Sequence, residues 1–357
     1  MNTFTNTAVK LQLTILLTAL LIIFGLTPNL SAEDKFNPAP IFSIPIGTDS
    51  PEKIGQWVDE EKIKNYDYFY FPASFITFEK LNFILILDSA KNRVCKYSLT
   101  GQFEGDFKIP FKERAVDIAY SADLKRLFTV FQDSCKIGEC QIDFKVKPLV
   151  AKSSKLIELP DQFKDITNSI QKIWLFNNDN SNEIFLGANV NSKIKNAVFA
   201  YANEKLTYIK VDDAIKNAVF ACSNQSATDI LLTPKSARFI VFDFKTKNVE
   251  WFDLLKEFIP KVGGFCCRSV QPAGSDLKNN YYVKALYGHS EDKISKAYIY
   301  RFNKNGRFTG RGEVFISPAM LTNRFITIDN TGNIYYMKKN EKDKKIEFYK
   351  FEINELN

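Results

Sequence analysis

The chain has 357 residues, 45% of them hydrophobic and 25% charged, and it carries a formal net charge of +7. Its cations are spread along the chain, and even the Lys-rich stretch 338–345 contains acidic residues, which argues against a basic stripe for nucleic acid, so we expect no nucleic-acid partner. Phe and Tyr number 32 and 15, while Gly numbers only 15. Aromatic side chains of this abundance suit half-buried β-strands.

The first 32 residues have the pattern of a secretion signal. Lys10 precedes an apolar run at 11–26, and Pro28 then breaks the pattern before a small-residue end at Ala32. The run is shorter than the about 20 apolar residues that a membrane span needs, so we expect a signal peptide, 1–32, that is cleaved after Ala32. The mature chain, 33–357, is then a single domain, secreted or periplasmic, without a membrane span. A retained N-terminal anchor is the alternative.

Six cysteines in an exported chain are expected to be partly paired, because the space outside the cytoplasm is oxidising. Cys135 and Cys140 flank a short Gly-containing segment between two strand-like runs, so we predict a disulfide that staples this hairpin. Cys95 alternates with apolar residues and is expected to be a buried thiol. The sequence leaves open the pairing of the remaining three cysteines, Cys222, Cys266 and Cys267.

Residues 72–107 show the clearest strand pattern in the chain. Apolar runs at 74–78, 83–89 and 94–99 are separated by turn residues. A turn at Gly101 then precedes a fourth run, because glycine tolerates the positive φ that hairpin turns require. Four short antiparallel strands in about forty residues predict one blade of a β-propeller.

This segment resembles the NHL-type repeat in its step from the second strand through the turn into the third. The positions that carry the resemblance are Ile86, Leu87, Asp88, Ser89, Asn92, Arg93, Val94, Gly101 and Phe103. Fragments of the same pattern recur at 298–315 and 325–340. The resemblance implies an all-β, six-bladed β-propeller, and seven blades are the alternative.

Clusters of strand-like runs continue to the C-terminus without a linker and set the expected blade limits. These limits are 72–111, 113–160, 165–211, 214–257, 263–317 and 323 onward. The last blade ends one strand short, while the run IFSIPIG at 41–47 has no partner nearby. We therefore predict that 41–47 pairs with the C-terminal strand and closes the propeller, since propellers must hide their edges. Pro45 restricts this strand to an edge.

A seven-residue sequence, IKNAVFA, occurs twice, at 194–200 and 215–221. The spacing is about half a blade, so the two copies cannot be the blade repeat itself. We expect similar strands in neighbouring blades.

No constellation of catalytic or metal-binding residues stands out, and we assign none. His289, the only histidine, lies beside Ser290 in a polar turn and is read as a solvated turn residue. Asp88 and Arg93 bracket a turn and are expected to form a structural ion pair. The oxygen-rich segment 177–183 is a low-probability Ca²⁺ site, because it lacks the ligand spacing of a calcium loop.

These observations favour a non-enzymatic binding or scaffold protein that engages a protein or extracellular polymer through a loop face, as a monomer and without a cofactor. The alternative is a hydrolase similar to gluconolactonases or strictosidine-synthase-like proteins, with a divalent metal in the central channel. Asp117 and Asp329 are inner-strand candidates for such a site. Three or more converging carboxylate or Asn side chains would favour the enzyme, and an apolar or Lys-lined channel would favour the scaffold.

Overall fold

The computed structural model assigns residues 38–357 to one unit. The ranges that it describes are 39–47, 49–55, 57–58, 69–70, 73–131, 134, 136–160, 170–177, 184–190, 196–202, 205–209, 219–221, 226–233, 236–243, 246, 248–254, 266–288, 294–315, 324–340 and 342–354. The expected signal peptide, 1–32, lies outside them. Within these ranges, no helix has the length and apolar character to cross a membrane.

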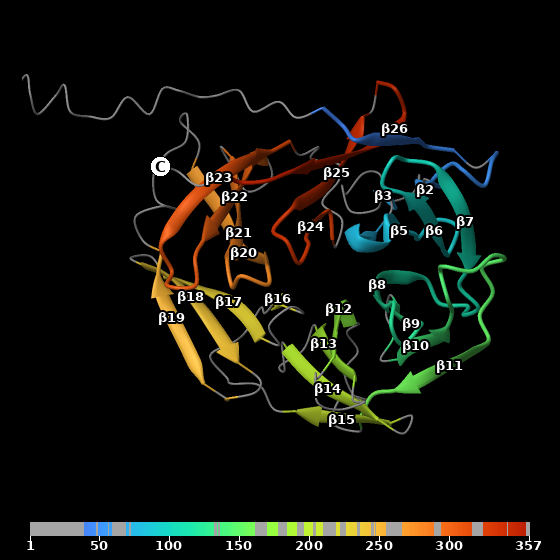
Figure 1. Ribbon diagram of the computed structural model, residues 1–357, viewed down its shortest axis with the longest axis horizontal. Coiled ribbons are helices and arrows are strands. Elements are labelled where there is room, and N and C mark those ends of the chain that lie inside the picture. The colour runs from blue at the N-terminus through green and yellow to red at the C-terminus, as the bar shows by residue number, and fades with distance from the viewer. Residues whose placement is uncertain are drawn as a thin grey trace, which may run out of the picture. The chain divides into compact units, whose positions relative to one another are not determined.

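The described residues form six four-stranded antiparallel sheets, which we number along the chain (Figure 1). The first three are β4 (Ser74–Phe78), β5 (Phe83–Asp88), β6 (Arg93–Ser98) and β7 (Phe103–Lys108); β8 (Ala115–Ser121), β9 (Arg126–Phe131), β10 (Lys136–Gln141) and β11 (Ser153–Glu158); and β12 (Ile170–Asn177), β13 (Ile184–Val190), β14 (Asn196–Ala202) and β15 (Lys205–Ile209). A short 3-10 helix, η2 (Glu79–Leu81), joins β4 to β5.

The last three sheets follow the same order of strands. They are β16 (Val219–Ala221), β17 (Ser226–Thr233), β18 (Ser236–Asp243) and β19 (Val249–Asp253); β20 (Cys266–Ser275), β21 (Tyr281–Gly288), β22 (Ile294–Phe302) and β23 (Phe308–Val314); and β24 (Ile326–Ile328), β25 (Ile334–Asn340) and β26 (Lys345–Phe351) with β1 (Phe42–Pro45).

First strands contact one another from the first sheet to the third, and from the fourth sheet round to the first. β4 contacts β8, β8 contacts β12, β16 and β17 contact β20, β20 contacts β24, and β24 returns to β4. Sheets that pack through their innermost strands in this order define an all-β propeller, as the sequence predicts. The innermost strands therefore bring residues far apart in the chain together at the centre.

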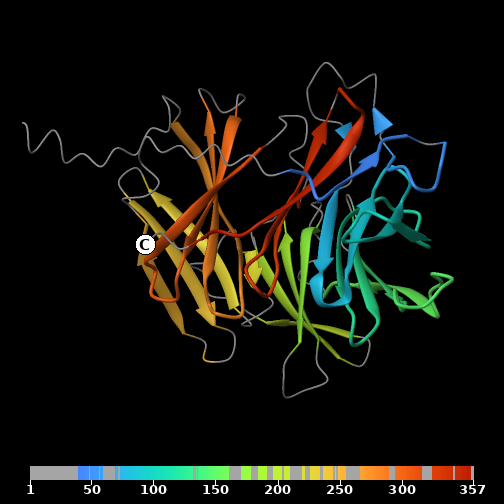
Figure 2. The same cartoon turned by 45° about the horizontal axis from the view of Figure 1, so that its top comes forward.

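The N-terminal strand β1 pairs with the C-terminal strand β26 (Figure 2), which is the pairing that the isolated run 41–47 predicts. Phe42 lies opposite Phe348 with the two rings stacked at 4.7 Å, and Ile44 lies opposite Ile346. β1 is the outermost strand of its sheet, so Pro45 occupies the edge position that a residue without an N–H requires.

The strand β5 shows why these strands read as continuous apolar runs. Its six residues are all buried, and successive side chains point to opposite faces. Ile84 and Ile86 join a core shared with the sixth sheet, whereas Phe83, Leu85 and Leu87 join a core shared with the second sheet. Each face of the sheet is thus covered by a neighbouring sheet, so apolar side chains can occupy both faces of β5.

The second sheet corrects the predicted disulfide. Residues 136–141 form strand β10 rather than a turn, and Cys140 is a free, buried thiol within the apolar core of the first two sheets. The sequence predicts a turn at Gly138, but a Cβ there would lie 2.5 Å from the Phe111 ring and 2.7 Å from the Phe131 ring. Glycine is required by packing at this position, so the hairpin that the disulfide needed does not exist. Cys135 itself lies outside the described residues.

Part of the connection between β1 and β4 forms a small sheet of its own. β2 (Trp57–Val58) pairs with β3 (Phe69–Tyr70) in antiparallel register.

Candidate functional site

Three innermost strands, β8, β12 and β20, carry a β-bulge. The register shifts between Ala115 and Asp117 in β8, and similar shifts precede Lys172 in β12 and Ser269 in β20. A bulge inserts one unpaired residue and re-aims the side chains beside it, and bulges concentrate next to functional sites. The residues that follow the bulges are therefore candidates for a functional site at the centre of the propeller.

Arg324 reaches across this centre from the residues that precede β24. Its backbone N–H donates to Ala73 O at 3.2 Å, so the chain here is tied to the first sheet. Its Nη2 donates to Asp117 Oδ2 at 2.6 Å in the second sheet and also to the carbonyl of Ile173 in the third. The guanidinium lies 5.2 Å from the centre of the Trp174 ring. Through its backbone and its side chain together, this one residue thus links the first, second and third sheets to the sixth.

Asp117 is held firmly in this arrangement. Its side chain is fully buried, and the same Oδ2 that pairs with Arg324 also accepts the Ile173 N–H at 2.9 Å. Its other oxygen, Oδ1, is buried without a hydrogen-bond partner, as are Arg324 Nε and Ser74 Oγ. Buried polar atoms without partners are costly. Their concentration at the meeting point of the inner strands marks this region as unusual.

Two lysines stand near this pair. Lys172 follows the bulge in β12, and Lys284 in β21 lies with its ammonium 4.9 Å from the centre of the Phe325 ring. Burial lowers the pKa of both lysines, to about 7 for Lys284, and the positive charge of Lys172 lowers the pKa of Lys284 further. Both side chains keep partial exposure. Among the residues that the structure describes, no carboxylate forms an ion pair with either ammonium.

We call Asp117, Lys172, Lys284 and Arg324 the central charged cluster. It contains three cationic side chains and one carboxylate, and that carboxylate is already paired. A divalent metal prefers several carboxylate, carbonyl or amide oxygens, whereas three nearby cations would repel it. Within the described ranges, no three His, Cys, Asp or Glu residues lie close enough to hold a metal ion. The residues present do not fit the metal site of a propeller hydrolase.

Asp329, the other sequence candidate, lies in a turn and not in the central charged cluster. Its Oδ1 accepts the N–H groups of Thr331 and Asn333, and its Oδ2 accepts from Asn333 Nδ2 at 2.7 Å. These hydrogen bonds lower the pKa of Asp329 against the opposing effect of burial. Asp276 organises the corresponding turn of the fifth sheet in the same way with Asn280. Asp329 is therefore a turn-forming residue.

Asp88 and Arg93 form the structural ion pair that the sequence predicts, with Arg93 Nε 3.0 Å from Asp88 Oδ2. Arg93 Nη2 also donates to Lys53 O at 2.7 Å, and Asp88 Oδ2 accepts the Gly55 N–H at 3.1 Å. The pair thus anchors the segment that follows β1 onto the first sheet. In the NHL-like step, the ion pair therefore stabilises the fold.

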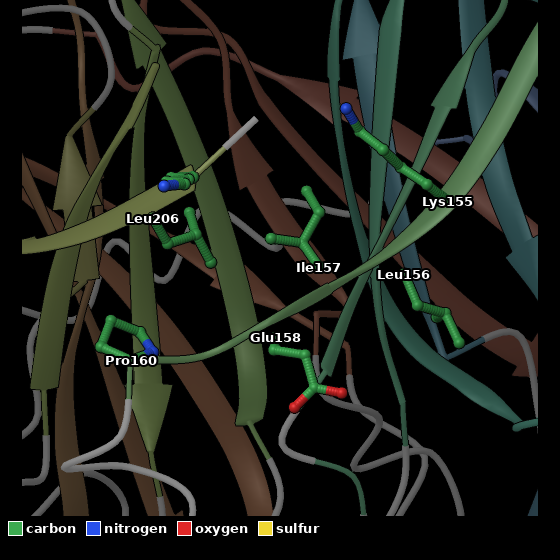
Figure 3. Close-up of a pocket in the computed structure, with 7 residues that line it drawn as sticks. Lys155, Leu156, Ile157, Glu158, Pro160 and Leu206 are labelled. Atoms are coloured by element: carbon green, nitrogen blue, oxygen red, sulfur yellow. The ribbon is translucent and has the colours of Figure 1, made fainter. Parts of the chain in front are cut away.

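A surface groove of about 400 Å³ lies between β11 and β15, the outermost strands of the second and third sheets (Figure 3). Ile157 and Leu206 point toward each other across it, while Lys155 and Glu158 point to opposite sides. Lys155 forms an ion pair with Glu139 at 3.3 Å, and Tyr201 from the third sheet donates to the same carboxylate. These contacts join the two sheets.

Several sequence candidates lie outside the described residues, namely His289, Ser290, Cys222 and residues 178–183 of the segment considered for Ca²⁺. The structure adds Lys172, Lys284 and Arg324, which the sequence analysis did not single out. One signal was available for the two lysines, because each interrupts an apolar strand, in QKIWLF and in YYVKALYG. Nothing in the sequence places Arg324 beside Asp117.

No protein-family model matches the chain, and no curated protein matches it by sequence. Among solved structures, the chain is similar to a member of the DUF4221 family from Bacteroides vulgatus, with a TM-score of 0.57 and 10% identity over 90% of this chain and 99% of that one. A luciferin-regenerating enzyme gives 0.48 and 10% over 80% and 91%, and the Dos1 propeller gives 0.46 and 11% over 81% and 82%. At these identities the likeness shows the fold alone, a β-propeller.

Proposed function

We propose that the chain is an exported, non-enzymatic β-propeller that binds a protein or extracellular polymer through a loop face, as a monomer. The observation that carries this proposal is the composition of the central charged cluster, in which Lys172, Lys284 and Arg324 outnumber one paired carboxylate. A cationic centre is suited to holding a ligand by charge. It lacks the set of oxygen ligands through which a propeller hydrolase would act.

The finer architecture belongs to the same proposal. We infer a ring of six blades, one for each four-stranded sheet, that is closed when β1 completes the sixth sheet; a ring of seven remains the alternative. Support comes from the contacts between successive innermost strands and from the pairing of β1 with β26. The Asp88–Arg93 pair at the NHL-like step supports kinship with NHL-type propellers.

The second candidate, a metal-dependent hydrolase or lactonase, makes a different prediction about metal. We expect the purified mature protein to hold no stoichiometric Ca²⁺, Zn²⁺ or Mn²⁺, and its melting temperature to be unchanged by EDTA, because Asp117 is bonded to Arg324 and Asp329 to its own turn. Elemental analysis and a thermal melt would measure this. A stoichiometric metal that is lost in Asp117→Asn would establish the enzyme and end the proposal.

Export makes a prediction about the N-terminus. The short apolar run and its small-residue end predict that the mature chain begins at Glu33. Mass spectrometry of native material should therefore find a chain of residues 33–357 outside the cytoplasm. An intact Met1 on a cytoplasmic protein contradicts both the cleavage and the secreted or periplasmic location.

A further inference from the structure

We propose that the central charged cluster is a binding site for an oxyanion group, such as a carboxylate, sulfate or phosphate, with Lys172 and Lys284 as the residues that contact it. This inference rests on the proposed binding function and names the chemical class of a ligand for it. The Arg324–Asp117 ion pair lies beneath these lysines and stays intact when the anion binds.

The first step of the argument is the excess of charge. Four sheets contribute to the cluster: Lys172 from the third, Lys284 from the fifth, Arg324 from the sixth and Asp117 from the second. Asp117 pairs with Arg324 at 2.6 Å and also acts electrostatically on Lys172, so one negative charge faces three positive ones. A low-dielectric site at which one sign of charge predominates attracts the opposite charge strongly.

The second step is the environment of Lys284. Its neighbours in β21, Val283 and Ala285, are fully buried, and its ammonium stands over the Phe325 ring. Its pKa of about 7 means that the site exists in two protonation states near neutral pH. The charged group that acts on Lys284 is Lys172, which itself faces Asp117 and Arg324. A bound anion offsets the cost of both ammonium groups, so binding and protonation of Lys284 support each other.

The third step is access. Lys172 and Lys284 are each partly exposed, whereas Asp117 and Ser74 beside them are fully buried. An anion can therefore reach the lysines without displacing the Arg324–Asp117 pair. The Trp174 ring lies next to Arg324 and is 9% exposed, so its fluorescence can report binding.

The test uses the mature protein, residues 33–357, with sulfate and acetate as probes at constant ionic strength, because both stay ionised between pH 6 and 9. We expect calorimetry and tryptophan fluorescence to show binding at pH 6, with an affinity that falls about tenfold or more toward pH 9 as Lys284 loses its proton. Sulfate tests a tetrahedral dianion and acetate tests a carboxylate. Tighter sulfate binding indicates a sulfate- or phosphate-bearing ligand, and tighter acetate binding indicates a carboxylate-bearing one.

Substitutions separate the lysine from a general charge effect. K284M should bind at least about tenfold more weakly at pH 6 and lose the pH dependence, whereas K284R should keep its affinity up to pH 9, because arginine stays charged. K172M should also weaken binding. The matched control is K278M, which removes the same charge from an exposed position in the turn between β20 and β21 and should behave as wild type. Circular dichroism checks the folding of each variant.

Two results would overturn the anion site: no binding of either probe to the wild type at pH 6, or equal binding by K284M and the wild type. Neither result bears on the metal content of the protein. Failure of the anion site is therefore distinguishable from failure of the proposed function, which elemental analysis decides.

Discussion

Deleting residues 33–47 from the mature protein is expected to lower the free energy of unfolding by about 3–6 kcal/mol, because two large side chains lose their burial at about 1.5–3 kcal/mol each. These are Phe42 and Ile44, which are 8% and 1% exposed in the core of the sixth sheet. The deletion also uncovers the edge of β26. Domains are typically stable by about 5–15 kcal/mol, so this loss is a large share, and chemical denaturation of both forms would measure it.

Point substitutions in β1 and just before it provide the control. Ile44→Ala is expected to cost about 2–5 kcal/mol, as buried Ile→Ala changes do. Ile41→Ala should cost much less, because Ile41 is 38% exposed and contributes mainly its backbone hydrogen bond to Phe348. If the shortened protein unfolds at the same denaturant concentration as the mature one, β1 does not close the sheet in a way that matters for stability.

Replacing Arg324 with Met is expected to destabilise the protein by about 3–5 kcal/mol, since it leaves a buried carboxylate without its partner. Asp117 is fully buried, and its remaining hydrogen bond, from the Ile173 N–H, cannot compensate a full negative charge. The free energy of unfolding from urea denaturation would give the size of the loss.

A double-mutant cycle tests the cause. Asp117→Asn keeps an acceptor for the Ile173 N–H and removes the charge, so the variant with both substitutions should be more stable than Arg324→Met alone. Coupling of about 0.5–3 kcal/mol is usual for residues in direct contact. Additive effects of the two substitutions would mean that the ion pair does not hold the inner strands together.

The sequence predicted the fold well where local pattern decides it. The strands of the first sheet follow directly from alternating apolar runs and turn residues, and the isolated run with Pro45 at an edge position pointed to its C-terminal partner. The same local reasoning failed at Gly138, because a glycine needed for close packing looks like a glycine needed for a turn. The repeated heptapeptide also shows the limit of local pattern, because identical sequences occupy different strand positions. Residues 196–200 of the first copy lie in β14, the third strand of its sheet, and residues 219–221 of the second lie in β16, the first strand of the next sheet.

The site was less predictable than the fold for a physical reason. Asp117 and Arg324 are separated by 207 positions, and only the packing of innermost strands brings them together. From the sequence, Asp117 is a candidate metal ligand, because nothing in the sequence reveals that Arg324 is its partner. A lysine within an apolar strand, as at Lys284, is the one local mark of the site, since a charge at such a position must face either a partner or water.

The pairing of β1 with β26 sets the order in which the protein can be completed. Residues 42–45 and 345–351 are separated by about 300 positions, so β1 leaves the ribosome long before its partner is made. Throughout this interval Phe42 and Ile44 have no core to enter, and an unpaired apolar strand is a site for wrong association. Pairing over this sequence distance is also slow, because a long loop must close first. Completion of the sixth sheet is therefore expected to be a late step of folding.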